Sequence, residues 1–264
     1  MSDAVTPAQP EPPGPVGFLL SLGVMGIASL AWFALIGGLV FALAYAAQGE
    51  AGVRALAELI DPSRLTRLSK PDEAGQAAAL FALASMLYAS AIVGCLSVAM
   101  LWGGRNLADL LAWREPFPRL RLRYWPWLVA IALYHLAAGS FLRLLYPEFS
   151  VLLRMPREAL ALGMSFLAIV ILAPLAEELF FRGWIYGALR ARFSASLSIP
   201  LCTIVFAMAH WDGMGLYPLA VLAPGLVLTI LRERTGSAKA SFLAHAVYNF
   251  IGWAGLAVIS VWGG

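Results

Sequence analysis

The amino-acid sequence predicts an all-α, polytopic bundle of about seven transmembrane helices, and its low charge and the spacing of that charge lead to this prediction. Of the 264 residues, 61% are apolar and only 12% are charged, whereas about 25% of the residues in a soluble globular domain carry a charge. Charge-free windows of 18 residues or more alternate with charged segments, and about 20 apolar residues cross a hydrocarbon core roughly 30 Å thick. The windows are 17–49, 74–104, 124–142, 159–176, 193–211, 213–231 and 240–264.

The amino-terminal end of the chain is predicted to be a short tail followed by one long helix. Residues 1–16 include five prolines and are expected to be disordered. Residues 17–48 form the first predicted span, which as a helix would reach about 48 Å at 1.5 Å per residue. Because this exceeds the hydrocarbon thickness, the helix must tilt, break near Gly37 and Gly38, or extend beyond the bilayer.

Residues 17–158 are predicted to hold the amino-terminal membrane helices and their amphipathic connections. In the connection 49–75, charged side chains alternate with leucines, which is typical of an interfacial helix or two. Counting such a helix would raise the total to eight. The second and third spans are predicted at about 76–103 and 124–142.

Residues 159–264 are predicted to contain the remaining spans and to form the functional core of a single membrane domain. The fourth span is expected at about 159–181 and the fifth at about 195–211. A turn at Asp212 and Gly213 leads to the sixth span, which ends at Leu231, and the seventh begins at about residue 240.

The net charge of +3 does not indicate nucleic-acid binding, because the basic side chains lie in short loops between apolar spans. The predicted partner is the lipid bilayer.

With a cytoplasmic amino end, ten Lys or Arg (five, two and three) fall in inside loops and seven fall in outside loops, which favours that orientation. No eukaryotic targeting signal is evident and the composition is rich in Ala, Leu, Gly and Arg, so we expect an integral protein of a bacterial inner (plasma) membrane.

A few ionisable and polar side chains interrupt the predicted spans. An ionisable group inside a membrane costs several kcal/mol and is a functional hypothesis by default. The candidates are Glu177, Glu178 and Arg182 in the fourth span, His210 in the fifth, His245 and Asn249 in the seventh, and His135 in the third.

Helical geometry separates the two adjacent glutamates. Glu178 and Arg182 are four residues apart and share a face, so they can form an ion pair. Glu177 is rotated by about 100° from Glu178 and needs another partner. Pro174 lacks a backbone N–H and should kink the helix, opening space beside the Glu177 carboxylate. The alternative is that all three charges form a purely structural ion cluster.

His245 and Asn249 are also four residues apart, so their side chains can point toward one place. Each histidine alone could equally be a satisfied hydrogen-bonding group between helices. Together with the Glu177 carboxylate and His210, however, they provide a base, two imidazoles and an amide. That set suits the activation of a water molecule and the stabilisation of an oxyanion.

Three short motifs on successive apolar segments resemble those of a known family. The motifs are Glu177-Glu178-Leu-Phe-Phe-Arg182, Phe206-Ala-Met-Ala-His210 and His245-Ala-Val-Tyr-Asn249. In this order they resemble the CPBP family of CAAX proteases and bacteriocin-processing or Abi-type proteins, which includes the type II CAAX prenyl endopeptidase. The resemblance covers about residues 160–255. It implies a helical bundle with a catalytic cavity inside the membrane and an intramembrane endopeptidase activity.

The resemblance also implies a role for each motif residue. Glu177 would be the general base that deprotonates a water held by His210. His245 and Asn249 would stabilise the tetrahedral oxyanion, and Glu178 with Arg182 would support the site. The implied partner is a membrane-associated protein or peptide substrate.

The cofactor expectation follows from the same comparison, which favours a metal-free glutamate mechanism. The sequence has no His-Glu-x-x-His motif, the pattern that places two imidazoles on one helical face for zinc. Zinc bound by Glu177, His210 and His245, with one open position, is the alternative.

Two other functions fit parts of the pattern. A non-catalytic immunity or scaffold protein would bind a peptide or membrane partner through the same residues. A proton-coupled transporter would use Glu177 and His210 as a relay, but such folds usually show inverted repeats that this chain lacks. His135 matches no motif and is expected to be structural, as are Cys95 and Cys202, which have no Cys-x-x-Cys partner.

Overall fold

The computed structural model describes residues 14–59, 74–103, 107–114, 158–211 and 216–262, with short pieces at 126, 129–134, 137–138 and 141. Every regular element in these ranges is a helix, and none of them contains a strand. The predicted all-α fold class is therefore confirmed. Most of the predicted third span, including His135, and the predicted turn at Asp212 and Gly213 lie outside the described residues.

Helix α1 (Pro15–Gln48) is a single element of 34 residues that runs through Gly37 and Gly38 without a break. At 1.5 Å per residue it is about 51 Å long. Only two of its side chains, Ser21 and Met25, are buried, so much of its apolar surface is available to lipid. The helix ends at Gly49, whose φ of +60° is a conformation that side-chain-bearing residues rarely adopt.

Helices α2 (Glu50–Leu59) and α4 (Ala74–Gly103) follow α1 in the amino-terminal part, and the single turn α5 (Leu107–Leu110) comes after them. Helix α2 follows Gly49 directly and is the described part of the predicted interfacial segment. Helix α4 is the second predicted span and packs against α1. At Gly94 the two backbones approach so closely that a Cβ would collide with the Ser29 hydroxyl and stand 2.9 Å from the Met25 carbonyl oxygen.

The fourth predicted span is longer than expected, because the helix continues to Arg190. It contains two π-helical segments, in which the hydrogen bonds reach back five residues. The Ala173 N–H, for example, bonds to the carbonyl of Ala168. These wide turns lie on either side of Pro174, and the helical segments follow one another without a break. In order, the segments are α7 (Ala159–Phe166), η4 (Leu167–Leu172), α8 (Ala173–Glu177), η5 (Glu178–Ile185) and α9 (Tyr186–Arg190).

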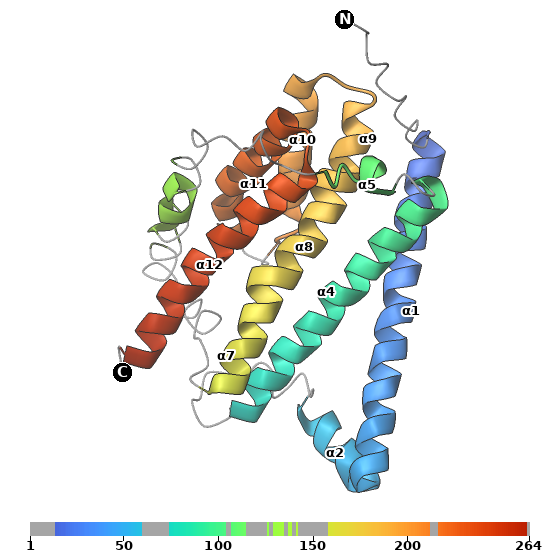
Figure 1. The fold of residues 1–264 in the computed structure, drawn as a ribbon, viewed down its shortest axis with the longest axis vertical. Coiled ribbons are helices and arrows are strands. Elements are labelled where there is room, and N and C mark those ends of the chain that lie inside the picture. The colour runs from blue at the N-terminus through green and yellow to red at the C-terminus, as the bar shows by residue number, and fades with distance from the viewer. Residues whose placement is uncertain are drawn as a thin grey trace, which may run out of the picture.

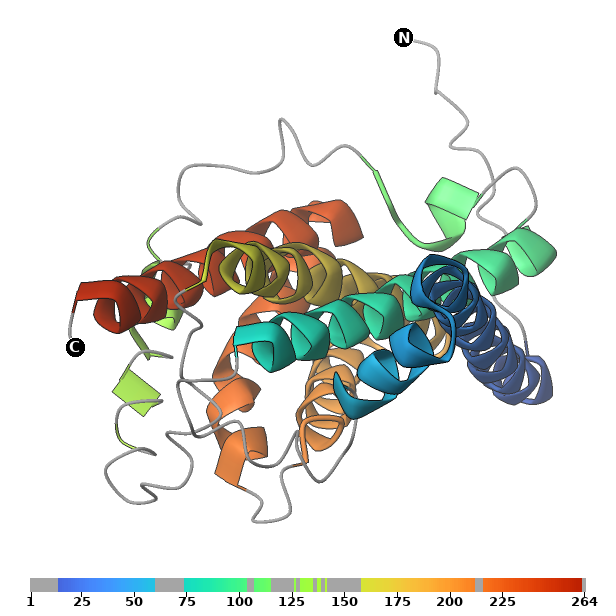
Figure 2. The same cartoon turned by 90° about the horizontal axis from the view of Figure 1, so that it is seen from below.

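Three helices complete the carboxy-terminal part: α10 (Ala195–Met208), α11 (Leu216–Thr235) and α12 (Ala238–Trp262). Helix α10 has 14 residues and is about 21 Å long, shorter than a hydrocarbon core and shorter than the predicted span 195–211. Helices α10 and α11 pack on each other, and α12 packs along η4, α8 and η5. Figure 2 shows α7 between α4 and α12, with α10 and α11 on one side of this row.

Four of the described helical segments are long and apolar enough to cross a membrane, and they correspond to the first, second, fourth and seventh predicted spans. They make the chain an integral membrane protein of the helical-bundle type. These segments are Pro15–Gln48, Ala78–Leu101, Ala159–Arg190 and Ala238–Val258. Figure 1 shows them running side by side, with α1 on the outside of the bundle.

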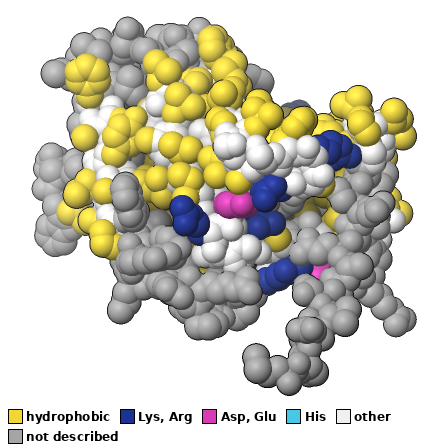
Figure 3. Space-filling model, turned by 90° about the horizontal axis from the view of Figure 1, so that it is seen from above, with side chains coloured by type: hydrophobic (Ala, Val, Ile, Leu, Met, Phe, Trp, Pro, Cys, Tyr) yellow, Lys and Arg dark blue, Asp and Glu magenta, His cyan; other side chains and the backbone are white. Residues whose placement is uncertain are grey.

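The end of the bundle where α9 stops, α11 stops and α12 begins carries charged side chains. Figure 3 views the molecule from this end and shows Lys and Arg around an acidic side chain. Glu233 accepts hydrogen bonds from the Arg190 guanidinium (3.1 Å) and the Tyr186 hydroxyl (2.7 Å). Burial raises the pKa of Glu233, but these donors outweigh it and hold the pKa below its ordinary value.

Candidate active site

Glu177 and Glu178 lie at the junction of α8 and η5, where they face different surroundings. The Glu178 side chain is fully buried, whereas 18% of the Glu177 side chain is exposed. The carboxylate of Glu178 accepts a hydrogen bond from Arg182 Nη1 at 2.9 Å. The pair expected from the four-residue spacing therefore forms, and Glu177 takes no part in it.

Arg182 is held by three separate parts of the fold. Besides Glu178, its guanidinium donates through Nη2 to the Gly225 carbonyl at 2.9 Å and stands 4.2 Å from the centroid of the Phe206 ring. A buried ion pair is costly unless further polar partners compensate for lost water. The carbonyl and the aromatic face supply that compensation, although Glu178 Oε2 and Arg182 Nε have no partner among the described residues.

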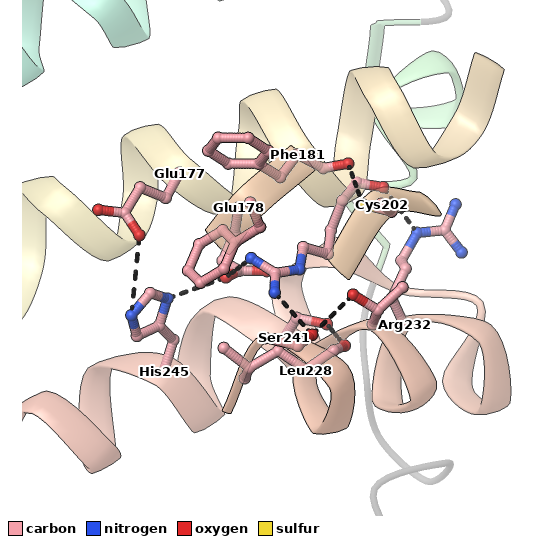
Figure 4. Close-up of polar contacts among 12 residues, drawn as sticks. Glu177, Glu178, Phe181, Cys202, Leu228, Arg232, Ser241 and His245 are labelled. Atoms are coloured by element: carbon pink, nitrogen blue, oxygen red, sulfur yellow. Dashed lines mark hydrogen bonds and ion pairs between the residues drawn. The ribbon is translucent and has the colours of Figure 1, made fainter. Parts of the chain in front are cut away.

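His245 connects the two glutamates (Figure 4). Its Nδ1 donates to Glu178 Oε1 at 2.9 Å, and its Nε2 lies 3.9 Å from Glu177 Oε2. Because a carboxylate paired with Arg182 accepts hydrogen bonds, Nδ1 carries the proton of this contact. In the neutral form of the ring, the Nε2 lone pair then faces the Glu177 carboxylate.

His210 approaches the same carboxylate oxygen from α10. Its Nδ1 lies 2.8 Å from the Phe206 carbonyl, which can only accept, so Nδ1 must donate. Its Nε2 lies 3.9 Å from Glu177 Oε2. Helix α10 is short and ends two residues before His210. His210 therefore approaches Glu177 from the end of α10, although Glu177 lies far from both ends of the helix that runs from Ala159 to Arg190.

The three facing atoms, Glu177 Oε2 and the two Nε2 atoms, are all hydrogen-bond acceptors in these protonation states. At 3.9 Å the imidazoles are too far from the carboxylate for a direct hydrogen bond. This spacing suits a small donor such as water between them. The side chains of Glu177 and His210 are 18% and 20% exposed, so a ligand can reach them, in contrast to Glu178 and Arg182.

Asn249 lies one turn after His245 and binds a backbone carbonyl. Its Nδ2 donates to the Ile169 oxygen at 2.8 Å. In the five-residue hydrogen-bond pattern of η4, the partner of Ile169 would be residue 174, which is proline and has no N–H. The amide of Asn249 satisfies the carbonyl that Pro174 leaves without a donor. The role of Asn249 at an oxyanion stays a prediction that would use its second N–H.

Aromatic rings surround the two imidazoles. Phe206 lies 4.6 Å from His210 and 6.3 Å from His245 between ring centroids. Its burial agrees with the packing role expected for it. Tyr217 lies 5.8 Å from the His210 ring and Tyr248 lies 6.0 Å from the His245 ring.

Sequence reasoning missed three tyrosines that interact electrostatically with the Glu177 carboxylate. They are Tyr88, Tyr217 and Tyr248. The position of Tyr248, inside the third motif, was a usable signal. No local pattern marked Tyr88, which lies 89 residues before Glu177.

Glu177, His210 and His245 are also the candidate ligands for a metal ion. In the part of the chain that the structure describes, no group of three or more His, Cys, Asp or Glu side chains is arranged to hold a metal ion. Both cysteines are buried and unpaired with each other, and they pack in two separate apolar clusters.

Comparison with known proteins gives one match. Residues 159–251 match the family model described as type II CAAX prenyl endopeptidase Rce1-like. None of the curated proteins and none of the solved structures that were compared matches the chain. The matched region begins with α7 and ends within α12, so it includes Glu177, His210, His245 and Asn249. Over this region the chain is similar to the Rce1-like family, whose model is described as a type II CAAX prenyl endopeptidase.

Proposed function

We propose that this protein is an intramembrane endopeptidase that hydrolyses a peptide bond of a membrane-associated protein or peptide by means of a glutamate-activated water. The observation that carries the proposal is the convergence of two imidazole Nε2 atoms on one oxygen of Glu177, each at 3.9 Å. A carboxylate surrounded by acceptors binds water as a donor and is well placed to remove its proton.

The reaction proceeds in two steps without a covalent enzyme intermediate. Glu177 takes a proton from water while the water oxygen forms a bond to the scissile carbonyl carbon, and the carbonyl electrons move to its oxygen. When the tetrahedral intermediate collapses, the carbon–nitrogen bond breaks and the proton passes from Glu177 to the leaving amine. The products are a carboxylic acid and an amine.

The surrounding residues position the base and the water. His210 holds the water through Nε2, because its Nδ1 is committed to the Phe206 carbonyl. The ion pair of Glu178 and Arg182 fixes the His245 ring through the 2.9 Å bond to Nδ1. The resemblance assigns the oxyanion to His245 and Asn249, and His245 would donate to it through Nε2 in the doubly protonated form of its ring.

The cofactor proposal is that no metal takes part. Ligand atoms about 2.0–2.1 Å from zinc in a tetrahedral site stand roughly 3.3 Å apart, and the Glu177–imidazole separations of 3.9 Å are wider. Histidines that bind a metal through one ring nitrogen usually donate a hydrogen bond through the other, as His210 and His245 do through Nδ1. Zinc bound by Glu177, His210 and His245 is therefore the alternative to test. Stoichiometric zinc in pure, active protein, with loss of cleavage on chelation, would overturn the metal-free mechanism.

The substrate is expected to reach the site from the bilayer, because Glu177 lies well inside a helix long enough to span a membrane. The family's name indicates peptides that end in a CAAX box and carry a prenyl chain, so a farnesylated CAAX peptide is the first probe. We place the protein in a bacterial inner membrane, where its own substrate is another membrane protein or peptide.

The decisive experiment replaces Glu177 by Gln. Removal of a general base lowers turnover by about 10²–10⁴-fold, measured with the farnesylated peptide and the purified full chain. Peptides that accumulate in membranes of cells carrying E177Q would name the natural substrate. The matched control is E233Q, at a glutamate in the charged end of the bundle, which should cleave normally.

A contrary result would identify the alternative function. If the wild type and E177Q behave alike in cleavage, and the cellular phenotype persists without Glu177, the chain is a scaffold or immunity protein and the proposal is wrong. Proton-linked flux in proteoliposomes that depends on Glu177 would instead indicate a transporter.

A further inference from the structure

The proposed hydrolysis needs hydrogen-bond donors for the oxyanion, and the residues around Glu177 supply mainly acceptors. In their neutral forms both imidazoles direct an unprotonated Nε2 toward Glu177, because the Nδ1 proton of each is donated to another group. The Asn249 amide already donates to the Ile169 carbonyl. Removing a single oxyanion donor costs an enzyme about 10²–10³ in turnover, so the source of a further donor matters.

Helix α4 is the element that can supply it, because it packs along the helix that carries Glu177. Cys95 and Val98 of α4 lie in one apolar cluster with Leu179 and Trp184, and α4 also contacts α7, η4 and α8. Both helices rise in the same direction in Figure 1. Positions nearer the start of α4 therefore lie level with earlier positions of its neighbour.

Tyr88 is seven residues before Cys95, or two helical turns, and so lies on the same face of α4. Because Cys95 shares an apolar cluster with Leu179 and Trp184 of η5, and α4 also contacts η4 and α8, this places Tyr88 at the level of η4 and α8. Independently, its phenol interacts electrostatically with the Glu177 carboxylate and with Tyr217. Tyr88 thus lies near the site and belongs to the part of the chain that the family model does not match.

The Tyr88 hydroxyl is also available. Within the ranges that the structure describes, no hydrogen bond to another residue engages it, whereas Tyr217 and Tyr248 have further interactions of their own. A phenol in this position can donate one hydrogen bond while remaining neutral. It therefore has the chemistry that the neighbouring acceptors lack.

We propose that Tyr88 is a catalytic residue whose hydroxyl donates a hydrogen bond to the carbonyl oxygen of the scissile peptide bond. The inference rests on the proposed endopeptidase function. As the water oxygen attacks the carbonyl carbon, negative charge develops on the carbonyl oxygen and the Tyr88 hydrogen bond strengthens without proton transfer. The bond weakens again when the carbon–nitrogen bond breaks and the carbonyl re-forms.

The first test is the kinetics of Y88F in the full-length protein with the farnesylated CAAX peptide. Because the donor acts in the transition state, Y88F should lower kcat by about 100-fold with little change in KM. The matched control is Y45F, which alters an exposed tyrosine near the end of α1 and should leave both constants unchanged. Y217F and Y248F should each have a smaller effect on kcat than Y88F.

The second test measures binding without turnover. A peptide aldehyde of the same sequence forms a tetrahedral hydrate, whereas the corresponding alcohol cannot. The wild type should bind the aldehyde more tightly than the alcohol, and Y88F should lose this preference while keeping its affinity for the alcohol. Unchanged alcohol binding also shows that Y88F is folded.

The outcomes separate this inference from the proposed function. If Y88F keeps wild-type kcat and a wild-type preference for the aldehyde, Tyr88 has no such role and the endopeptidase proposal stands. If the wild type neither cleaves the reporter nor prefers the aldehyde, the endopeptidase proposal fails and the Tyr88 inference fails with it.

Discussion

The amino-terminal helices and the carboxy-terminal helices are both apolar, yet they differ in what they do with polar groups. Helix α1 has 34 residues, none of them charged, and buries only two of its side chains. The helix that runs from Ala159 to Arg190 carries Glu177, Glu178 and Arg182 in its middle and buries a larger share of its apolar window. This difference indicates that charged side chains lie inside the bundle where neighbouring helices supply hydrogen-bond and ion-pair partners.

Two ion pairs with the same spacing make the contrast concrete. Glu50 and Arg54 in α2 are 3.8 Å apart with side chains 84% and 74% exposed, whereas Glu178 and Arg182 are 2.9 Å apart with no exposed side-chain surface. Water can replace either partner of the exposed pair. Only Gly225, Phe206 and His245 complete the buried one.

The largest expected effect on stability comes from breaking the buried pair. R182A leaves the Glu178 carboxylate buried without its cation, which typically costs about 3–5 kcal/mol. R54A removes a cation at the same spacing in the exposed pair and should change stability by only a few tenths of a kcal/mol. Reversible thermal or denaturant unfolding of both variants in detergent measures the difference. Equal losses would show that burial does not distinguish the two pairs.

A smaller effect is expected where α1 and α4 touch. G94V introduces a Cβ that would collide with Ser29 and crowd the Met25 carbonyl, and overpacking of this kind costs about 1–3 kcal/mol. The control is G38V, because a Cβ at Gly38 meets nothing within 4 Å. The same unfolding assay applies, and a loss in G38V as large as that in G94V would contradict the close contact.

The smallest expected effect tests why Asn249 binds Ile169. N249A removes the side-chain hydrogen bond to the Ile169 carbonyl, and such a bond typically contributes about 0.5–1.5 kcal/mol. P174A restores a backbone N–H at the position that should serve this carbonyl, so N249A should cost less in a P174A background. A double-mutant cycle measures this coupling. Additive losses would show that Asn249 does not compensate for Pro174.

The sequence was sufficient for the features that depend on local pattern. Charge-free windows predicted the helical membrane class and the first, second, fourth and seventh spans, since crossing a bilayer demands length and apolarity from a segment by itself. Four-residue spacing predicted the contact of Glu178 with Arg182. The motif order indicated the family whose model matches residues 159–251.

Helix ends and helix defects were predicted less well. The sequence gives no sign that the fourth helix continues to Arg190 or that α10 has only 14 residues. The kink expected at Pro174 stays a prediction. The sequence also gives no sign of the π-helical turns on either side of Pro174, or that the Asn249 amide from α12 satisfies the carbonyl that proline cannot serve. That compensation comes from a residue 75 positions away.

By itself, the sequence determined that this chain is a helical membrane protein and which polar residues lie within its spans, because hydropathy and helical period are properties of single segments. Only the tertiary structure decided that His210 and His245 both face one oxygen of Glu177, that Phe206 and Gly225 hold Arg182, and that Tyr88 of α4 approaches the site. These relations join different helices, and the packing of apolar faces fixes them without leaving a pattern in any one segment.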